Sequence, residues 1–269
     1  MTRFLVALAV WTMLSGAVEA GTPDTVWLEE LTWTELRDAV QSGTTTVIIP
    51  VGGVEQSGPA LALGKHDARA RVLAERIART LGHTLVAPVL PFVPEGSVSP
   101  PTSHMRFPGT ITVPAVVFRA TVSSIATSLE VHGFKTILLL GEHGSYQGDL
   151  AAAAADLNRR WSGAARAHFV PEYYRAATSG FASVLRNRGY STEEIGSHAG
   201  VADTSLTMAT APGLVRQDRL KAATGLDAAH GVYGDPRRSS SETGQLGADA
   251  IVNDTVAAVR SLMAHDPHP

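Results

Sequence analysis

Cysteine is absent from the 269 residues of this chain. Its absence excludes disulfides, thiolate nucleophiles and any zinc site built on cysteine, so a bound metal must be held by His, Asp or Glu. Long basic runs are also missing, since the net charge is −3 and basic residues run no longer than pairs such as Arg237-Arg238. Nucleic-acid partners usually need a concentrated basic face, so we expect no nucleic-acid partner.

The sequence has no apolar run long enough to cross a bilayer, which needs about 20 residues. An N-terminal apolar run over residues 4–14 follows Arg3 and leads into the small-residue ending Val18-Glu19-Ala20. This order is typical of a secretory signal peptide, and we predict cleavage after Ala20. The competing interpretation is an uncleaved anchor. Cleavage predicts an exported protein, periplasmic or secreted, with no membrane association and a single domain over residues 21–269.

Apolar runs alternate with segments of helical periodicity along the chain. Strands are expected at residues 46–51, 85–92, 135–140 and 167–170, and helices at residues 68–81, 114–132, 150–161 and 244–263. Near-continuous apolar strands separated by helices predict an α/β fold with a mainly parallel central sheet flanked by helices. The stretches 94–108 and 178–202, rich in Gly, Ser, Pro or charge, are expected to be irregular.

Polar residues follow two of the predicted strands. Glu55, His66 and Asp67 come after the first strand, and Glu142 and His143 come directly after the third. Sites in α/β sheets form at the carboxyl ends of strands, so these residues are candidates for one site. Their spacing matches no short metal motif such as H-E-x-x-H, and each residue also has an ordinary interpretation as a loop residue.

Five segments resemble, in order, motifs of the creatininase family of amidohydrolases. Residues 55–66 (EQSGPALALGKH) resemble its E-Q-H-G-P-H-L-P-L-x-T-D, and residues 107–110 resemble its F-P-G-T. Residues 141–146 resemble N-G-H-G-G-N, residues 198–205 resemble H-A-G-x-x-E-T-S, and residues 231–236 resemble G-x-x-G-D-P. The resemblance implies a layered creatininase-like fold, a homo-oligomer such as a hexamer, and hydrolysis of non-peptide or cyclic C–N bonds at a two-metal centre.

The resemblance also implies a ligand set, which this sequence alters. One metal's ligands fall on Glu55, His66 and His143, and the second metal's ligands fall on Ser57, the shared His66 and Ser145. Neutral hydroxyls are weak ligands, and an imidazole nitrogen has a single lone pair and is a poor bridge between two metals. We therefore expect one divalent metal on the first set, with zinc preferred and manganese or iron also compatible.

Four further residues are assigned around that metal. Asp67 and Glu142 are adjacent to proposed ligands, where they either hydrogen-bond the imidazoles or restore a second metal site, and we favour the first role. His198 stands where the family keeps a proton-handling histidine, so we expect it to protonate the departing nitrogen. Asp203 replaces the family's glutamate and is assigned to catalysis with His198.

The predicted function is that of an exported metal-dependent amidohydrolase. A metal-activated water would attack an amide, lactam or related carbonyl of a small-molecule substrate, which His104, Ser57 and Ser145 are expected to contact. The alternative is a creatininase-like protein that binds a metal or ligand without catalysis, since several family site positions are substituted. A serine hydrolase is disfavoured because neither Ser145 nor Ser205 lies in a G-x-S-x-G elbow.

Overall fold

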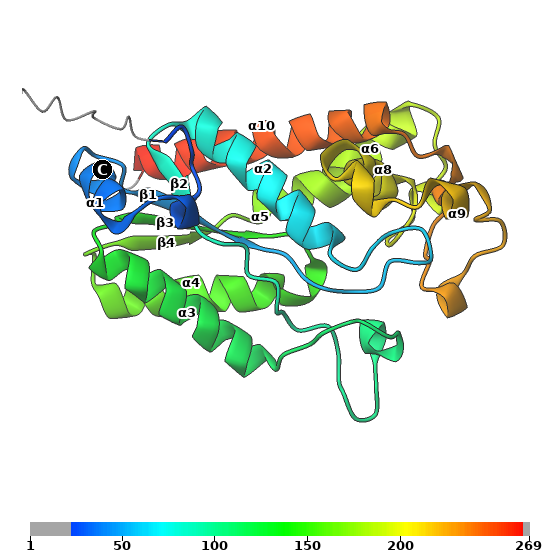
Figure 1. Ribbon diagram of the computed structural model, residues 1–269, viewed down its shortest axis with the longest axis horizontal. Helices are drawn as coiled ribbons and strands as arrows, with labels where there is room; N and C mark the ends of the chain where they lie inside the picture. Colours follow the sequence, from blue (N-terminus) through cyan, green and yellow to red (C-terminus); the bar gives the residue numbers. More distant parts are fainter. Residues whose placement is uncertain (1–22, 266–269) are drawn as a thin grey trace, which may run out of the picture.

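The computed structural model describes residues 23–265, so the predicted signal peptide lies outside the described residues. A four-stranded parallel sheet in the order β2-β1-β3-β4 forms its centre (Figure 1). The strands are β1 (Thr46–Val51), β2 (Thr84–Val86), β3 (Thr136–Gly141) and β4 (Arg166–Phe169). This arrangement confirms the predicted α/β fold with a mainly parallel central sheet.

Helices cover both faces of the sheet in separate layers (Figure 1). One layer holds α2 (Lys65–Leu81) and α10 (Ser241–His265), and the other holds α3 (Ala115–Val131) and α4 (Gln147–Trp161). Within residues 23–265, the helices are all too short or too polar to span a membrane.

Shorter helices complete the chain, most of them on the α2 and α10 side. The α-helices are α1 (Trp33–Gln41), α5 (Pro171–Arg175), α6 (Phe181–Asn187), α7 (Thr192–Ile195), α8 (Val201–Thr210) and α9 (Gln217–Lys221), and η4 (Ala176–Gly180) is a π-helix. The 3₁₀ turns are η1 (Leu28–Glu30), η2 (Ser103–Arg106), η3 (Gly144–Tyr146), η5 (Pro212–Leu214), η6 (Ala228–His230) and η7 (Pro236–Arg238).

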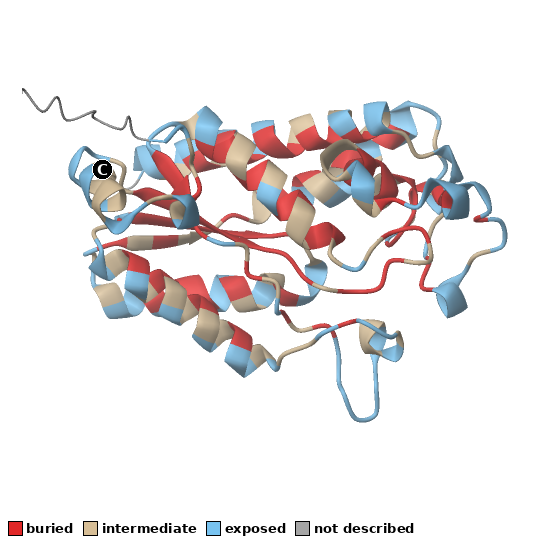
Figure 2. Cartoon of the chain, in the orientation of Figure 1, coloured by how far each residue is buried: buried red, intermediate tan, exposed pale blue. Residues whose placement is uncertain are grey.

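The core consists of two apolar layers, one on each face of the sheet. Successive strand residues point to opposite faces. Ile48 and Leu138 therefore belong to the cluster under α2 and α10, whereas Val47, Ile49 and Ile137 belong to the cluster under α3 and α4. Every residue of β1 is buried, as Figure 2 shows for the central strands. Burial on both faces explains why these strands read as continuous apolar runs.

The expected strand at residues 85–92 is wrong over most of its length. Within this segment only β2 (Thr84–Val86) pairs with β1, at Thr46 to Ile48, and the chain then leaves the regular ladder. Pro88 and Pro91 explain this early end, because proline has no N–H to donate to a neighbouring strand. A single bridge between Val51 and Leu90 keeps the segment close to the end of β1.

The expectation of an irregular stretch at residues 178–202 is also wrong, because α6 and α7 form within it. Phe181 and Leu185, four residues apart, are both buried on one face of α6. At α7, the Ser191 side chain accepts from the Glu194 N–H while the Glu194 side chain accepts from the Ser191 N–H. This capping box is a signal for the start of a helix. The prediction missed it because it relied on the overall composition of the stretch.

Candidate active site

The site lies at the carboxyl ends of β1 and β3, and a sharp bend after β1 creates it. Gly53 adopts φ +151°, a backbone conformation that favours glycine, and a Cβ there would lie 3.0 Å from Glu95 Oε1. Asp67 Oδ1 accepts a 2.9 Å hydrogen bond from the Gly53 N–H, which ties the loop to the first turn of α2. Glu55 is thereby placed in the interior with 0% of its surface exposed.

Glu55 is the centre of the site because its two carboxylate oxygens face different groups. On one side, Oε1 lies 2.7 Å from His66 Nε2 and 3.1 Å from Lys65 Nζ. On the other side, Oε2 lies 3.2 Å from His104 Nε2 and 3.3 Å from His143 Nε2. Glu55 Oε2 is buried and accepts no hydrogen bond from the described residues.

Glu55, Glu95, His104 and His143 each direct one ligand atom into a common space. These four atoms lie within 4.8 Å of one another. Both Glu95 carboxylate oxygens are buried without a hydrogen-bond partner, like Glu55 Oε2. Buried carboxylate oxygens without donors are unfavourable, and a divalent cation beside them would satisfy them. The donor set of two carboxylates and two imidazoles fits zinc, manganese or iron.

The protonation of this cluster depends on burial and on Glu55. Burial and the Glu55 charge raise the pKa of Glu95 to about 9. Burial lowers the pKa of His143 to about 3, so its imidazole is neutral at pH 7, the form that binds metals. Burial alone would raise the pKa of Glu55, but Lys65 and His66 outweigh it and hold that pKa below its ordinary value. A metal at this cluster would displace the Glu95 proton, so its affinity should increase with pH.

Ser145 determines which nitrogen of His143 faces the cluster. The Ser145 hydroxyl donates its hydrogen to the Pro94 carbonyl at 2.6 Å, so its oxygen must accept from His143 Nδ1 at 2.9 Å. The Ser145 N–H also approaches Nδ1, but at 3.4 Å this contact is the weaker one. Nδ1 therefore carries the proton, and the lone pair of Nε2 points toward Glu55 Oε2.

The mutation Ser145→Ala is expected to weaken divalent-metal affinity by roughly 10- to 100-fold, because it removes the group that orients a ligating imidazole. Ser145→Thr retains the hydroxyl and should retain most of the affinity. Competition titration with a chromogenic chelator measures the effect, with Ser124→Ala on the exposed side of α3 as the control. Equal affinities for Ser145→Ala and the parent would show that Ser145 does not orient His143.

His66 reaches the site, but protein groups occupy both of its ring nitrogens. With the proton on Nε2, it donates to Glu55 Oε1 at 2.7 Å, and Nδ1 accepts from Arg69 Nη2 at 2.9 Å. With the proton on Nδ1, it donates to Glu142 Oε2 at 3.1 Å, and Nε2 accepts from Lys65 Nζ at 2.9 Å. Neither tautomer leaves a lone pair for a metal. Its assignment as a ligand stays a prediction, and these contacts favour a role as a hydrogen-bond bridge.

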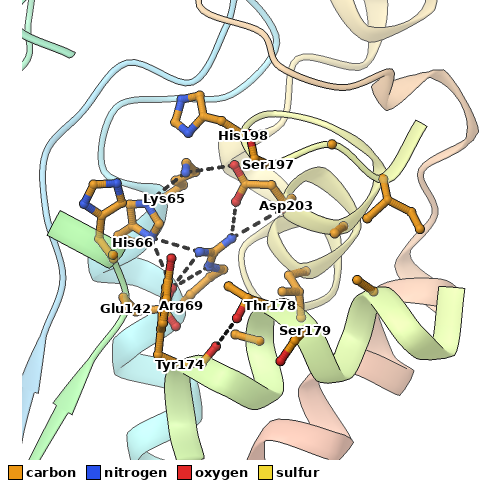
Figure 3. A pocket seen from close by; sticks show the side chains of 18 residues that line it. Lys65, His66, Arg69, Glu142, Tyr174, Thr178, Ser179, Ser197, His198 and Asp203 are labelled. Atoms are coloured by element: carbon orange, nitrogen blue, oxygen red, sulfur yellow. Dashed lines mark hydrogen bonds and ion pairs between the residues drawn. The ribbon is translucent and has the colours of Figure 1, made fainter. Parts of the chain in front are cut away.

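His66 contacts a buried ion-pair network through Arg69 (Figure 3). Arg69 pairs with Glu142 and with Asp203. The Tyr173 hydroxyl donates to Glu142 Oε1. Burial opposes ionisation of Glu142, but Arg69 and His66 outweigh it and lower its pKa to about 2. Lys65 and Arg69 likewise hold the pKa of Asp203 well below its ordinary value. Asp203 is therefore a fixed carboxylate that positions two cations.

His198 completes the ring of histidines around Glu55. Its Nε2 donates to the Gln56 carbonyl at 2.8 Å, which leaves the Nδ1 lone pair 3.7 Å from Glu55 Oε1. The ring centroid of His198 lies 4.7 Å from that of His104, which in turn lies 5.4 Å from that of His143. Burial and Lys65 lower the pKa of His198 to about 4, so it is neutral at pH 7 and able to accept a proton.

Two cavities meet at His143, Ser197 and His198. The larger, about 370 Å³, has a polar wall that includes Lys65 and Asp203, and an apolar wall formed by Ala177, Ala182, Ile195, Ala202 and Leu206. The smaller, about 280 Å³, is lined by Gln56, Ser103, His104, Arg106, Phe107 and Tyr233 besides the shared residues. These volumes suit a small molecule. Ser57, whose hydroxyl is buried without a partner, and Ser145 are not among the lining residues of either cavity.

Three charged residues of the site escaped the sequence analysis: Lys65, Arg69 and Glu95. Lys65 and Arg69 are four residues apart in α2, and this spacing places them on one helix face beside His66. That periodicity was a usable signal. Glu95 lies in the loop that leads from β2 to η2, and no neighbouring residue marks it as a ligand.

The fold is a parallel α/β sheet between two helical layers, and the site is a buried centre of carboxylates and histidines. A family model described as creatinine amidohydrolase matches residues 29–259, and the chain belongs to this creatininase family of amidohydrolases, enzymes that act on C–N bonds. The creatinine amidohydrolase of Pseudomonas putida is 29% identical over 203 residues, which cover 72% of this chain and 75% of that protein.

Solved structures show the same fold. A creatinine amidohydrolase (creatininase) structure matches with a TM-score of 0.74 at 22% identity and covers 91% of this chain and 99% of its own. A structure titled creatininase Mn matches with a TM-score of 0.71 at 23% identity, covering 90% of this chain and 99% of its own. A mutant creatininase described as Zn-Zn type matches with a TM-score of 0.73 at 24% identity, covering 91% and 100% of the two chains.

Proposed function

We propose that the protein is a metal-dependent amidohydrolase that uses one divalent ion to cleave a non-peptide or cyclic C–N bond of a small molecule. The observation that carries this proposal is the cluster of Glu55, Glu95, His104 and His143, whose buried carboxylate oxygens lack donors. Two cavities of small-molecule size open beside it. We propose zinc as the ion, with manganese or iron as compatible replacements.

The metal ion, His198 and Gln56 would each have a separate role in hydrolysis. A divalent ion held there would polarise the substrate carbonyl and lower the pKa of a water molecule. His198, neutral and lining both cavities, would accept a proton from the attacking water at Nδ1 and return it to the departing nitrogen. The Gln56 carbonyl fixes the His198 ring by accepting from Nε2.

The substrate that we propose is an amide or lactam with an apolar substituent. The larger cavity is lined by both charged and apolar side chains, which suits a molecule with a polar reacting end and an apolar substituent. The Pseudomonas putida relative is named for creatinine. We do not expect efficient creatinine turnover here, because Ser57 and Ser145 stand where the family resemblance puts ligands of a second metal.

Metal removal should abolish hydrolysis. The parent protein is expected to hold about one equivalent of divalent metal per chain. His143→Ala should lose that metal and reduce kcat/KM by roughly 10²-fold or more, because it removes one of the four proposed metal ligands. Mass spectrometry for metal content and a panel of amides, lactams and creatinine measure both effects. His132→Ala, at an exposed position after α3, is the matched control and should change neither quantity.

The same experiment separates the enzyme from its alternative. Hydrolysis that chelation abolishes and metal restores would support the amidohydrolase. A protein that binds metal stoichiometrically but hydrolyses none of the panel would support instead a creatininase-like binding protein without catalysis.

We also propose that the protein is exported, on the strength of the N-terminal sequence pattern alone. Expression of the full chain followed by N-terminal sequencing of the extracellular or periplasmic fraction tests this proposal. A mature protein that begins at Gly21 would support it, whereas retention of Met1 would favour the uncleaved anchor.

Self-association to a homo-oligomer, with a hexamer as the specific expectation, is a proposal that rests on the family resemblance. Sedimentation equilibrium of the mature protein tests it directly. A monomer at working concentrations would contradict it.

A further inference from the structure

Lys65 places a buried positive charge in the middle of the site (Figure 3). It is the first residue of α2, and its side chain is 1% exposed. Its ammonium nitrogen lies 3.1 Å from Glu55 Oε1, 2.9 Å from Asp203 Oδ2 and 2.9 Å from His66 Nε2. A lysine ammonium has three N–H donors, and these partners account for all of them when His66 carries its proton on Nδ1.

The three partners of Lys65 are themselves residue types that bind divalent metals. Two carboxylates and one imidazole converge on a single point from three parts of the chain: the loop after β1, the start of α2 and the first turn of α8. Such a set would hold a transition-metal ion if its centre were free. Here the ammonium occupies that centre.

Glu55 separates this point from the metal cluster described above. Its Oε1 accepts from Lys65, whereas its Oε2 faces His104 and His143 without a hydrogen bond. One carboxylate therefore has a cation on one side and unsatisfied space for a cation on the other. This geometry resembles a two-cation centre in which one of the cations belongs to the protein.

We propose that Lys65 is an internal cation that occupies a second metal position and so limits the protein to one metal ion. A divalent ion at that position would meet the ammonium at contact distance and be repelled. Lys65 also acts as a positioning residue, because it fixes Glu55 Oε1 and directs Oε2 toward the cluster. The inference rests on the proposed function only for the first ion, at Glu55, Glu95, His104 and His143.

Removal of the lysine side chain should convert the position into a metal site. Lys65→Ala removes the cation that the Glu55 and Asp203 carboxylates share. Glu55 then loses its ammonium partner, and Asp203 keeps only the Arg69 guanidinium. A buried carboxylate that has lost a cation is unfavourable, so a divalent ion that enters is bound strongly. His66 Nε2 is then freed from Lys65 and becomes available as a ligand.

The test is metal content per chain after equilibration with Zn²⁺ or Mn²⁺ and gel filtration, measured by mass spectrometry. The expected values are about one equivalent for the parent and about two for Lys65→Ala. Lys135→Ala, at an exposed lysine, makes the same change in net charge and should stay at one. The double variant Lys65→Ala/Asp203→Asn, which removes one carboxylate of the new site, should return to one. Equal contents for the parent and Lys65→Ala, or two equivalents in the parent, would overturn the proposal.

A second measurement covers the case in which Lys65→Ala does not fold without metal. For Lys65→Ser, which keeps a small polar group at the position, we expect Tm to rise more with added Zn²⁺ than it does for the parent. An equal rise in both proteins would overturn the proposal. Failure of the proposed function is a different result: no hydrolysis, or no metal in the parent, while Lys65→Ala still holds one equivalent more.

Discussion

The variant Glu55→Gln is expected to lose its bound metal and to reduce kcat/KM by roughly 10³-fold. Glutamine keeps the size of the side chain but removes the negative charge that faces His104 and His143 through Oε2. It also offers an N–H₂ group where the cluster needs an acceptor. Because Glu55 contacts both the metal cluster and Lys65, no other single side chain of the site is expected to have so large an effect.

The measurement pairs metal content with kinetics of the parent's best substrate, and circular dichroism establishes that the variant is folded. Glu242→Gln, at an exposed position at the start of α10, removes the same charge outside the site and should leave both quantities unchanged. A folded Glu55→Gln protein that keeps one equivalent of metal and most of its activity would show that the metal lies elsewhere.

The sequence predicts the strands well where the only requirement on a strand is that its residues are buried. β1 begins and ends at the predicted residues 46 and 51, because a central parallel strand must be apolar on both faces. β3 and β4 differ from the prediction by about a residue for the same reason. The predicted strand at residues 85–92 is too long for a local reason. The prediction followed the apolar composition of this segment and gave too little weight to the prolines that end β2.

The site could be predicted only in part, because its charges depend on partners far apart in the chain. Glu55 and His143 stand out by following strands, and the structure brings both to one cluster. Lys65 would ordinarily be read as a solvated residue, since lysine is rarely buried without a counter-charge. One of its two counter-charges, Glu55, lies ten residues earlier, but the loop between them gives no sign that they pair. The other, Asp203, lies 138 residues further along the chain, and nothing local to Lys65 reveals it.

Arg69→Leu is expected to lower the free energy of unfolding by about 3–5 kcal/mol at pH 7, the usual cost of removing one partner from a buried ion pair. Leucine fills part of the volume, but Glu142 and Asp203 each lose a guanidinium contact in the interior. The Glu142 pKa points in the same direction, since Arg69 and His66 lower it to about 2 against the opposing effect of burial. Urea unfolding measures the change. Arg159→Leu, which breaks an exposed pair with Asp156, should cost less than about 1 kcal/mol.

The pH dependence of the Arg69→Leu effect distinguishes lost charge pairing from lost packing. In the parent, the folded-state pKa of Glu142 is below its unfolded value, so its contribution is present above about pH 4.5 and is lost as the pH falls toward 2. In the variant, burial without Arg69 should raise that pKa above the unfolded value, so protonation at low pH relieves the unpaired charge. The stability difference between the two proteins should therefore shrink as the pH falls from 7 to 4. A difference that stays constant over this range would mean that Arg69 stabilises the fold through packing rather than through its charge.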